Sequence, residues 1–573
     1  MSSATSSFLR QGQLALSKGD HRSALGAYLQ AFVETPDAVA VQRGLVRVLG
    51  ITKGYQLPKA VTDYLAEAAL KNQLDVQALA TALNNQLDNS AALHQLLDKY
   101  SAEPTSKIDL GKYQDAFDEV LTDKLLLLVL NQATAISPHI EQLVTYLRKH
   151  ALMERVYGGP ATGGLWHMFP GVLAACANQC FHTEYVFDFD AAEVDLLAAL
   201  EQKFTDNAAA MEPEDCVALA MYQPLLARLF ELGDTVVSAV DASVPNWPAW
   251  ATGVWVEQAQ LPYAETKLAD ALPAFTRIDP GLSAEVQQQY ERFPYPRWQS
   301  ANISDAPISL KAMLGQHLHA TMQPQLPDGP VSTLFAGCGT GQQVVQMASS
   351  ISMSAVRAVD LSRTSLAHAQ RKSAELGLET IEYGQADILA INNWQEAYDF
   401  IVCTGVLHHM ADPALALKSL LAVSKPHTVF FLALYSERAR SHVIAAREHI
   451  KKQAIPDTIE GIRLLRKHVR TLPGGHPMHR VAGSREFYSA SGLHDLVFNR
   501  HELRFTPLEL KALLEENELT FAGFHMDGAE HKLLYQNRFP DDPAMTNLDN
   551  WDKLEMETPE LFTKMMQFWC YRT

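Results

Sequence analysis

Three glycines stand at alternate positions directly after an apolar segment of strand length. Val331–Ala336 is apolar enough to form a buried strand, and Gly337, Gly339 and Gly341 follow it. Glycine permits a tight turn and lets a ligand approach the backbone where a Cβ would collide with it. Asp360 ends the next predicted strand, about 20 residues further on. A carboxylate at this place can accept hydrogen bonds from a ribose diol, so we expect a nucleotide-type ligand.

The spacing of the glycines indicates which nucleotide is bound. The dinucleotide fingerprint is G-x-G-x-x-G, whereas this loop reads G-x-G-x-G and has Gln342 where the last glycine would stand. The loop resembles motif I of the class I S-adenosylmethionine-dependent methyltransferases, in which the turn packs on the methionine part of the cofactor. Phe335 is a departure, because most of these enzymes carry an acidic residue two positions before the first glycine. A lone glycine loop also fits a structural turn, so the downstream pattern decides.

Further strands alternate with helical segments after the loop. We expect strands at 355–360, 381–387, 428–435, 519–524 and 566–572, the last of them antiparallel, and a further strand with its exit loop at 398–409. This pattern predicts an α/β Rossmann-like class I methyltransferase domain with a seven-stranded, mostly parallel sheet, preceded by an all-α helical region.

The length of 573 residues predicts two or three domains. We expect a tetratricopeptide-like helical region at 1–105, a helical middle domain at 106–280 for dimerisation or substrate docking, and the methyltransferase domain at 281–573 with a helical insertion at about 436–515. Residues 8–36 match one tetratricopeptide unit with its turn at 18–20. The helical region is either a packing or dimerisation module, with a homodimer as a hypothesis, or a concave groove for a peptide.

Composition and charge exclude some classes of binding partner. Lys and Arg number 47 against 65 Asp and Glu, a formal net charge of −18, which repels phosphate backbones, so nucleic acid is not expected as a partner. The six cysteines form no C-x-x-C pair, which is typical of reduced thiols in a cytoplasmic protein. Neither a secretion signal nor membrane insertion is expected.

An aromatic segment precedes the sheet domain. It contains Tyr290, Phe293, Tyr295, Arg297 and Trp298. Two prolines within it fix an extended backbone. The segment is either a linker pinned on the sheet domain or a lid whose aromatic faces cover the cofactor sulfonium or a cationic substrate.

Together the motifs resemble one family. It comprises bacterial class I methyltransferases with an N-terminal helical, partly tetratricopeptide region, and it includes the rickettsial protein-lysine methyltransferases of outer membrane proteins. The similar segments are 123–151, 178–187, 289–298, 336–343, 434–437, 487–505 and 566–569. The motifs at 289–298 and 487–505 are the most specific to this group.

The resemblance implies S-adenosylmethionine as the cofactor and names the residues that hold it. The implied contacts are Ala336, Gly337, Cys338, Gly339, Gly341 and Gln342 around the methionine part, Asp360 and Leu361 at the ribose, Asp387 and Ile388 at the adenine, and Thr404, Gly405 and Val406 beside the methyl group.

Candidate catalytic residues lie where the strands end. Methyl transfer needs a nucleophile aligned with the methyl group, and a lysine amine must also be neutral. His408, His409 and Tyr435 follow strand ends, whereas Tyr488 and His494 rest on the resemblance. The two histidines handle a proton or only pack on the cofactor, and Tyr435 orients the substrate or belongs to the core. No metal site is expected.

Three functions compete. The leading prediction is N-methylation of lysine side chains in a protein or peptide substrate. A methyltransferase for a small metabolite or a non-lysine peptide side chain is the second, and a closed pocket lined by Tyr295, Trp298 and Tyr488 would favour it. A non-catalytic interaction scaffold is the third, and the intact glycine loop argues against it.

Overall fold

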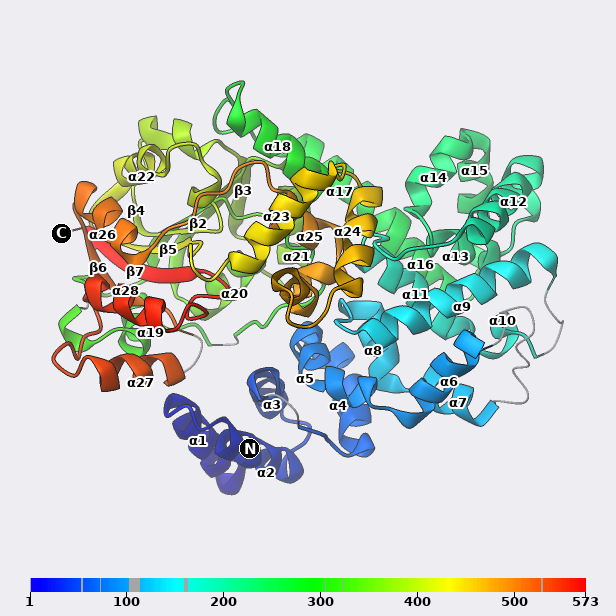
Figure 1. Cartoon of the computed structure of the whole chain (residues 1–573), viewed down its shortest axis with the longest axis horizontal. Coiled ribbons are helices and arrows are strands. Elements are labelled where there is room, and N and C mark those ends of the chain that lie inside the picture. The colour runs from blue at the N-terminus through cyan, green and yellow to red at the C-terminus, as the bar shows by residue number, and fades with distance from the viewer. Residues whose placement is uncertain are drawn as a thin grey trace.

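The computed structural model describes residues 2–52, 55–72, 74–102, 114–158, 163–304, 306–322, 324–526 and 529–572. A helical half and a sheet half lie side by side (Figure 1). The predicted domain boundary at 105–106 lies outside the described residues, and the proposed division into three domains stays a prediction.

Helices make up the first half of the chain. They are α1 (Ser3–Ser17), α2 (His21–Glu34), α3 (Val39–Ile51), α4 (Lys59–Asn72), α5 (Val76–Asp88), α6 (Ala91–Ala102), α7 (Gln114–Leu121), α8 (Lys124–Gln132), α9 (Pro138–Tyr157), α10 (Leu165–Met168), α11 (Pro170–His182), α12 (Ala191–Asn207), α13 (Pro213–Ala220), α14 (Leu225–Leu232), α15 (Asp234–Ser243), α16 (Ala249–Trp255) and α17 (Leu261–Ala271). The expected all-α region is confirmed.

The first two helices form the predicted hairpin. Asp20 caps α2 by accepting a hydrogen bond from the Ser23 amide. The Tyr28 ring lies where small residues leave room, because a Cβ on Gly12 would stand 2.6 Å from it and a Cβ on Gly44 2.2 Å. The glycine of the first helix and the aromatic residue of the second therefore pair as the repeat pattern predicts, although assignment to the tetratricopeptide family stays a prediction.

Seven strands form one sheet in the order β3-β2-β1-β4-β5-β7-β6. Their bounds are β1 (Val331–Ala336), β2 (Met353–Asp360), β3 (Ile381–Gln385), β4 (Tyr398–Thr404), β5 (Ser424–Leu434), β6 (Leu519–Phe524) and β7 (Met566–Arg572). Strands β1 to β5 are parallel, and β7 pairs antiparallel with both β5 and β6. The predicted fold class is confirmed, including the direction of the last strand.

Helices cover the sheet and lead into it. They are α18 (Leu282–Arg292), α19 (Leu310–His317), α20 (Gln342–Ser350), α21 (Arg363–Glu375), α22 (Pro413–Ala422), α26 (Pro507–Glu516), α27 (Ala529–Arg538) and α28 (Leu548–Glu557). Two apolar cores flank the strands, and Phe430 and Phe431, neighbours on β5, belong to different ones. This is the alternation expected of a sheet that is buried on both faces.

The insertion after β5 packs on the helical half rather than on the sheet. Its helices are α23 (Ser441–Gln453), α24 (Ile459–Thr471) and α25 (Ala490–Leu493), followed by a π-helical turn at His494–Phe498. Ile462 and Leu465 of α24 are buried in the core of the first-half helices. Arg466 joins the two parts through a 2.6 Å ion pair with Glu141 of α9.

The end of the insertion differs from the prediction. Leu510 and Leu514 of α26 belong to a sheet core, so the part of the predicted insertion beyond Phe505 packs with the strands. A capping box formed by Thr506 and Glu509 opens α26 as predicted.

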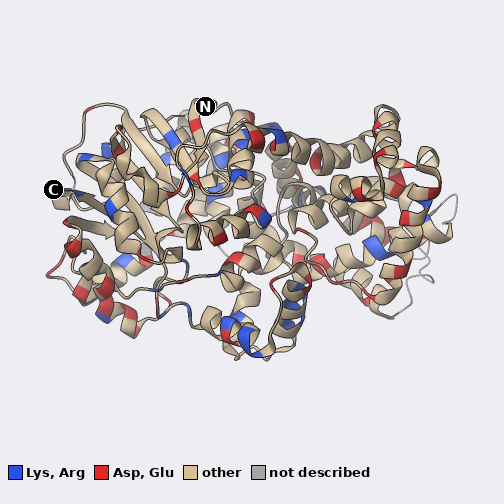
Figure 2. Ribbon diagram, turned by 90° about the horizontal axis from the view of Figure 1, so that it is seen from above, with Lys and Arg blue, Asp and Glu red and all other residues tan. Residues whose placement is uncertain are grey.

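Charged residues of both signs are mixed over both halves of the ribbon (Figure 2). Across the described ranges, with gaps such as 103–113, no helix has both the length and the apolarity that a membrane crossing requires.

Candidate active site

The glycine loop lies between β1 and α20 and is tightly packed. Gly337, Gly339 and Gly341 have φ angles of +73°, +54° and +80°, a region that side chains rarely adopt. A Cβ on Gly337 would lie 2.3 Å from Val406, and one on Gly341 would lie 2.6 Å from the Cβ of Ala369. The loop therefore needs glycine for its conformation and for its close neighbours. It brings the implied residues of β1 and of the turn after β4 together.

Asp360 ends β2 and holds the loop. Its carboxylate accepts hydrogen bonds from the Gly339 amide at 2.8 Å and from the Ser362 amide at 2.9 Å. Burial raises the pKa of the Asp360 carboxyl, while these two amides act against that effect. Each carboxylate oxygen retains a second lone pair. The position therefore fits the ribose diol of S-adenosylmethionine.

The end of β3 carries the second implied acidic residue. Asp387 is buried, and its carboxylate accepts a 2.9 Å hydrogen bond from the Leu389 amide. Its own amide donates to the Thr276 hydroxyl at 2.8 Å, so a segment from the linker after α17 fixes this strand end. Thr404 donates to the side chain of Gln343 in α20 at 2.6 Å. The donor and acceptor groups at the carboxyl ends of β1 to β4 thus fit the cofactor that the resemblance implies.

Residues 289–298, which we call the aromatic strap, cross the glycine loop. Trp298 donates its indole N–H to the Thr340 carbonyl at 2.8 Å, and the Thr340 hydroxyl donates to the Pro296 carbonyl. The Tyr295 carbonyl oxygen would stand 2.9 Å from a Cβ on Gly339. Trp298 is buried beside Val345 of α20. This end of the strap is therefore pinned on the sheet domain, as one of the two alternatives predicts.

Two tyrosines of the strap contact the insertion instead. The Tyr290 hydroxyl donates to Asp495 at 2.7 Å, and the Tyr295 hydroxyl donates to Glu486 at 3.3 Å. The Tyr290 carbonyl accepts a 3.1 Å hydrogen bond from the hydroxyl of Ser362, beside the ribose carboxylate. The strap therefore links the cofactor end of β2 with two carboxylates of the insertion, which is the placement that the lid alternative needs.

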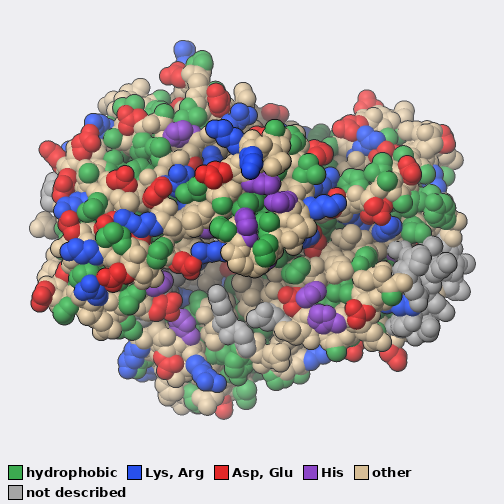
Figure 3. All heavy atoms as spheres, in the orientation of Figure 1, with side chains coloured by type: hydrophobic (Ala, Val, Ile, Leu, Met, Phe, Trp, Pro, Cys, Tyr) green, Lys and Arg blue, Asp and Glu red, His purple; other side chains and the backbone are tan. Residues whose placement is uncertain are grey.

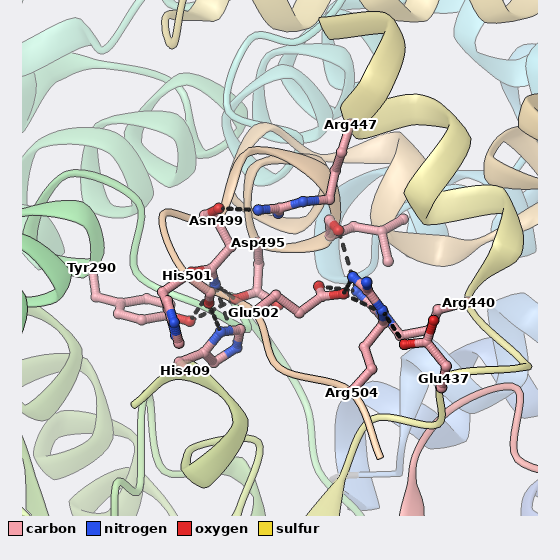
Figure 4. A network of polar contacts seen from close by, with 11 residues as sticks. Tyr290, His409, Glu437, Arg440, Arg447, Asp495, Asn499, His501, Glu502 and Arg504 are labelled. Carbon is pink, nitrogen blue, oxygen red and sulfur yellow. Dashed lines mark hydrogen bonds and ion pairs between the residues drawn. The ribbon is translucent and has the colours of Figure 1, made fainter. Parts of the chain in front are cut away.

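A buried polar cluster surrounds Asp495 (Figure 4). The Asn499 amide nitrogen lies 3.2 Å from the Tyr290 hydroxyl, 3.4 Å from His409 Nε2 and 3.5 Å from Asp495. The Nδ1 atom of His409 lies 2.8 Å from the His501 carbonyl, which only accepts. His409 is thus held with its proton on Nδ1 and with Nε2 as an acceptor.

Burial sets the charge states in this cluster. It lowers the pKa of His409, although Asp495 opposes that effect, and it raises the pKa of the Asp495 carboxyl. His409 is therefore neutral at pH 7. The proton affinity of Asp495 is higher than that of a solvated aspartate, which is the property of a group that accepts a proton during catalysis.

His408 and Tyr435 lie beside this cluster as a stack. Their ring centroids are 3.7 Å apart, and the Arg440 guanidinium lies 3.6 Å from the Tyr435 centroid. Arg440 in turn forms a 2.7 Å ion pair with Glu502. Burial lowers the pKa of His408 well below its ordinary value. The geometry favours the packing alternative for His408, while Tyr435 lies at the strand end where a substrate-orienting group is expected.

The remaining predicted residues lie elsewhere. Tyr488 is buried in the core of the helical half, with Arg466, Arg470 and Glu141 as charged neighbours. Trp298 and Tyr488 belong to different apolar cores, which gives no support to the closed pocket that would favour a small-metabolite substrate.

Three further predicted residues, two of them in the strap, make contacts between the strap and the helical elements. His494 stacks on Phe293 at 4.4 Å and contacts Asp457 at 2.6 Å. The Arg297 guanidinium lies 5.0 Å from the Phe181 ring of α11. These contacts support the strap, and the catalytic role of His494 stays a prediction.

Asp495, Asn499 and Glu486 were not among the residues predicted from sequence. A signal was available, since Asp495 is an acidic residue within an apolar segment, and a buried carboxylate needs a partner. Asp495 and Asn499 are four residues apart, and Asn499 directly follows the π-helical turn at His494–Phe498, a feature that sequence periodicity does not reveal.

The chain shares sequence and structural similarity with methyltransferases. Residues 331–469 match the family profile described as a methyltransferase domain. An uncharacterised protein of Synechococcus sp. is 27% identical over 208 residues, which are 35% of this chain and 49% of that protein. The ubiquinone biosynthesis O-methyltransferase of Pseudomonas putida is 29% identical over 114 residues, 20% of this chain and 47% of that enzyme. PKMT2 from Rickettsia typhi, solved in complex with AdoHcy, is 17% identical with a TM-score of 0.33, covering 44% of this chain and 49% of that one.

The chain spans about half the length of the curated relatives it matches. The family match falls on β1 to α24 and includes the glycine loop and Asp360. The last strand, β7, runs antiparallel between β5 and β6, in the direction that was predicted for it. The sheet domain therefore matches a methyltransferase-domain profile and has the fold and glycine loop expected of a class I S-adenosylmethionine-dependent methyltransferase domain.

Proposed function

We propose that the protein transfers a methyl group from S-adenosylmethionine to an amine, most simply the side chain of a lysine in a protein or peptide. The observation that carries this proposal is the pair of carboxylates, Asp495 and Glu486, that accept hydrogen bonds from Tyr290 and Tyr295 of the strap. Carboxylates and tyrosine rings attract an ammonium group, and a neutral acceptor would gain less from them.

The cluster also offers a place for an N–H donor. The Oδ1 atom of Asn499 is buried and has no hydrogen-bond partner among the described residues. A buried acceptor without a partner is costly, so a substrate N–H would stabilise it. Asn499 would then orient the acceptor nitrogen beside Asp495.

The proposed chemistry assigns a role to the raised pKa of Asp495. A lysine enters as an ammonium ion and must lose one proton before its nitrogen has a free electron pair. The Asp495 carboxylate would accept that proton, and burial favours its protonated form. The nitrogen would then form a bond to the methyl carbon as the sulfur–carbon bond breaks. Tyr290 and Asn499 would hold Asp495 in place throughout.

A hydroxyl of a small molecule is the second candidate acceptor. The observation that favours it is the tautomer of His409, whose Nε2 is a neutral acceptor and can take a proton from a phenol. The similarity to ubiquinone biosynthesis O-methyltransferases points to the same chemistry. The two candidates differ in which group accepts the proton, Asp495 or His409.

The test is mass spectrometry after incubation with S-adenosylmethionine. Surface proteins, lysine-rich peptides and a metabolite extract would be offered separately, with Asp360→Ala as the variant that cannot hold the ribose. We expect methyl masses on lysines with the native protein and none with Asp360→Ala. Methylation confined to the metabolite extract would reject the lysine proposal. Unchanged cofactor affinity of Asp360→Ala in calorimetry would reject the placement of the ribose.

A further inference from the structure

A cleft of about 500 Å³ separates α3 and α5 from the sheet domain. We call it the arginine cleft, and its lining includes Arg43, Arg47, Thr81, Asn302, Gln346 and Arg485. The volume lies within the range of about 300–1,000 Å³ that is usual for ligand sites. Helices α3 and α5 lie beside the sheet half at the junction of the two halves (Figure 1).

The charge of the cleft is opposite to that of the chain. Its three arginines face one carboxylate, Asp75, in a protein whose formal net charge is −18. The side chains of Arg47 and Arg485 make no hydrogen bond or ion pair with the residues that the structure describes, although the charge of Arg485 acts to lower the pKa of Asp75. On the face shown in Figure 3, acidic and basic side chains are otherwise mixed. A local positive site in such a field selects anionic groups.

The cleft adjoins the candidate active site on two sides. Gln342 lines it and directly follows Gly341 of the glycine loop. Arg485 lines the cleft and directly precedes Glu486, which accepts a hydrogen bond from the Tyr295 hydroxyl. Consecutive Cα atoms lie about 3.8 Å apart, so the wall of the cleft adjoins both the glycine loop and the carboxylate that contacts the strap.

The polar lining suits a polypeptide. Asn302 and Gln346 carry amides that both donate and accept, and Thr81 adds a hydroxyl. Peptide groups present one donor and one acceptor at every residue. Guanidinium groups bind carboxylates in a fork geometry.

We propose that the arginine cleft binds an acidic segment of the polypeptide whose lysine is methylated, so that carboxylates near the acceptor determine which lysine is chosen. This inference rests on the proposed function and adds the class of sequence that the enzyme selects. The cleft would hold the acidic residues through Arg47 and Arg485, and the acceptor side chain would extend past Glu486 toward Asp495.

The test measures binding separately from methylation. A fluorescein-labelled peptide with one lysine and several glutamates is titrated with the full chain and followed by anisotropy, beside the same peptide with glutamines. We expect the acidic peptide to bind more tightly, and increasing salt to weaken it. Arg47→Glu and the milder Arg485→Gln should each lower its affinity at least about tenfold. Arg22→Glu, an exposed arginine of α2 outside the cleft, should leave it unchanged.

Equal binding of both peptides, or unchanged affinity in both cleft variants, would overturn the proposal. It would also be overturned if inorganic phosphate displaced the acidic peptide as effectively as unlabelled peptide does. The last outcome would mean a simple anion site. Intact, arginine-dependent binding without any methylation of the lysine would instead support the cleft and reject the proposed function.

Discussion

Asp495 is a carboxylate held in a position where its charge is costly. It is 7% exposed, it lies beside a neutral histidine, and its hydrogen-bond donors are uncharged groups of Tyr290 and Asn499. Structures keep such groups when function requires them, since a neutral side chain of the same shape would be more stable. The charged form of Asp495 therefore lowers the stability of the fold, and the same residue has the proposed role of proton acceptor.

Asp495→Asn should raise stability and lower activity. The folded pKa of Asp495 is above its ordinary value of 3.8, so the stability contribution of this residue is present below that value and is lost as pH rises through the folded pKa. We expect the Tm of the variant to exceed that of the native protein by a few degrees at pH 8, with the difference shrinking as pH falls toward 3.8. Methyl transfer should fall at least about 100-fold. Calorimetry and a methylation assay measure the two effects.

The matched control is Asp270→Asn, because Asp270 is exposed on α17. It should change neither Tm nor activity. A native-like rate with Asp495→Asn would remove this residue from the proposed chemistry.

The strap and the glycine loop act as one element. Trp298, Thr340 and Pro296 are linked by hydrogen bonds, and the Tyr295 carbonyl lies directly over Gly339. A change in the loop must therefore move the strap, and with it the tyrosines that reach Asp495 and Glu486. The position of the proposed acceptor site therefore depends on the loop that is predicted to hold the cofactor.

Gly339→Ala should disturb the contact between the glycine loop and the strap. The new Cβ would lie 2.9 Å from the Tyr295 carbonyl, and alanine disfavours the φ of +54° by about 1–2 kcal/mol. We expect the dissociation constant for S-adenosylmethionine to rise at least about tenfold in calorimetry and the Tm to fall. Gly474→Ala is the control, since no atom lies within 4 Å of its added Cβ. Equal cofactor affinity in both variants would show that the strap does not depend on the loop.

The sheet could be predicted from the sequence, but only part of the candidate site could. All seven strands lie where the apolar segments predict, because a buried parallel sheet needs continuous apolar runs. The residues predicted to hold the cofactor follow from the strand ends and from the resemblance. Asp495, Asn499 and Glu486 could not be placed, because their grouping depends on contacts with Tyr290 and Tyr295 of the strap, which is far away in the sequence. Tyr488 was predicted as a candidate catalytic residue, but tertiary packing places it in the core of the helical half.

At the scale of the whole molecule, α17 and α21 join the helical half to the sheet. Glu265 of α17 contacts His368 at 2.9 Å and Arg371 at 2.7 Å, both on α21. Burial alone would raise the pKa of Glu265, but the hydrogen bond with His368 and the charge of Arg371 lower it to about 2. The two halves are thus held together by a charge that must stay ionised.

Glu265→Gln should weaken this junction in a pH-dependent manner. The folded pKa is depressed, so the stability that Glu265 contributes is present above its ordinary value of 4.5 and is lost as pH falls toward about 2. We expect the variant to have a lower Tm at pH 7 and the gap to the native protein to close at strongly acidic pH. Glu448→Gln, on the exposed face of α23, should show no such gap. A constant difference at every pH would indicate lost packing instead.

The shared core of the first-half helices and the insertion has a consequence for the order in which the chain folds on the ribosome. Val443, Ile462 and Leu465 complete a core that begins with residues more than 150 positions earlier. That core stays unfinished while β1 to β5 are being synthesised, so its apolar surface is exposed to chaperones until the insertion emerges. A fragment that stops at residue 280 would keep that surface permanently open and should aggregate.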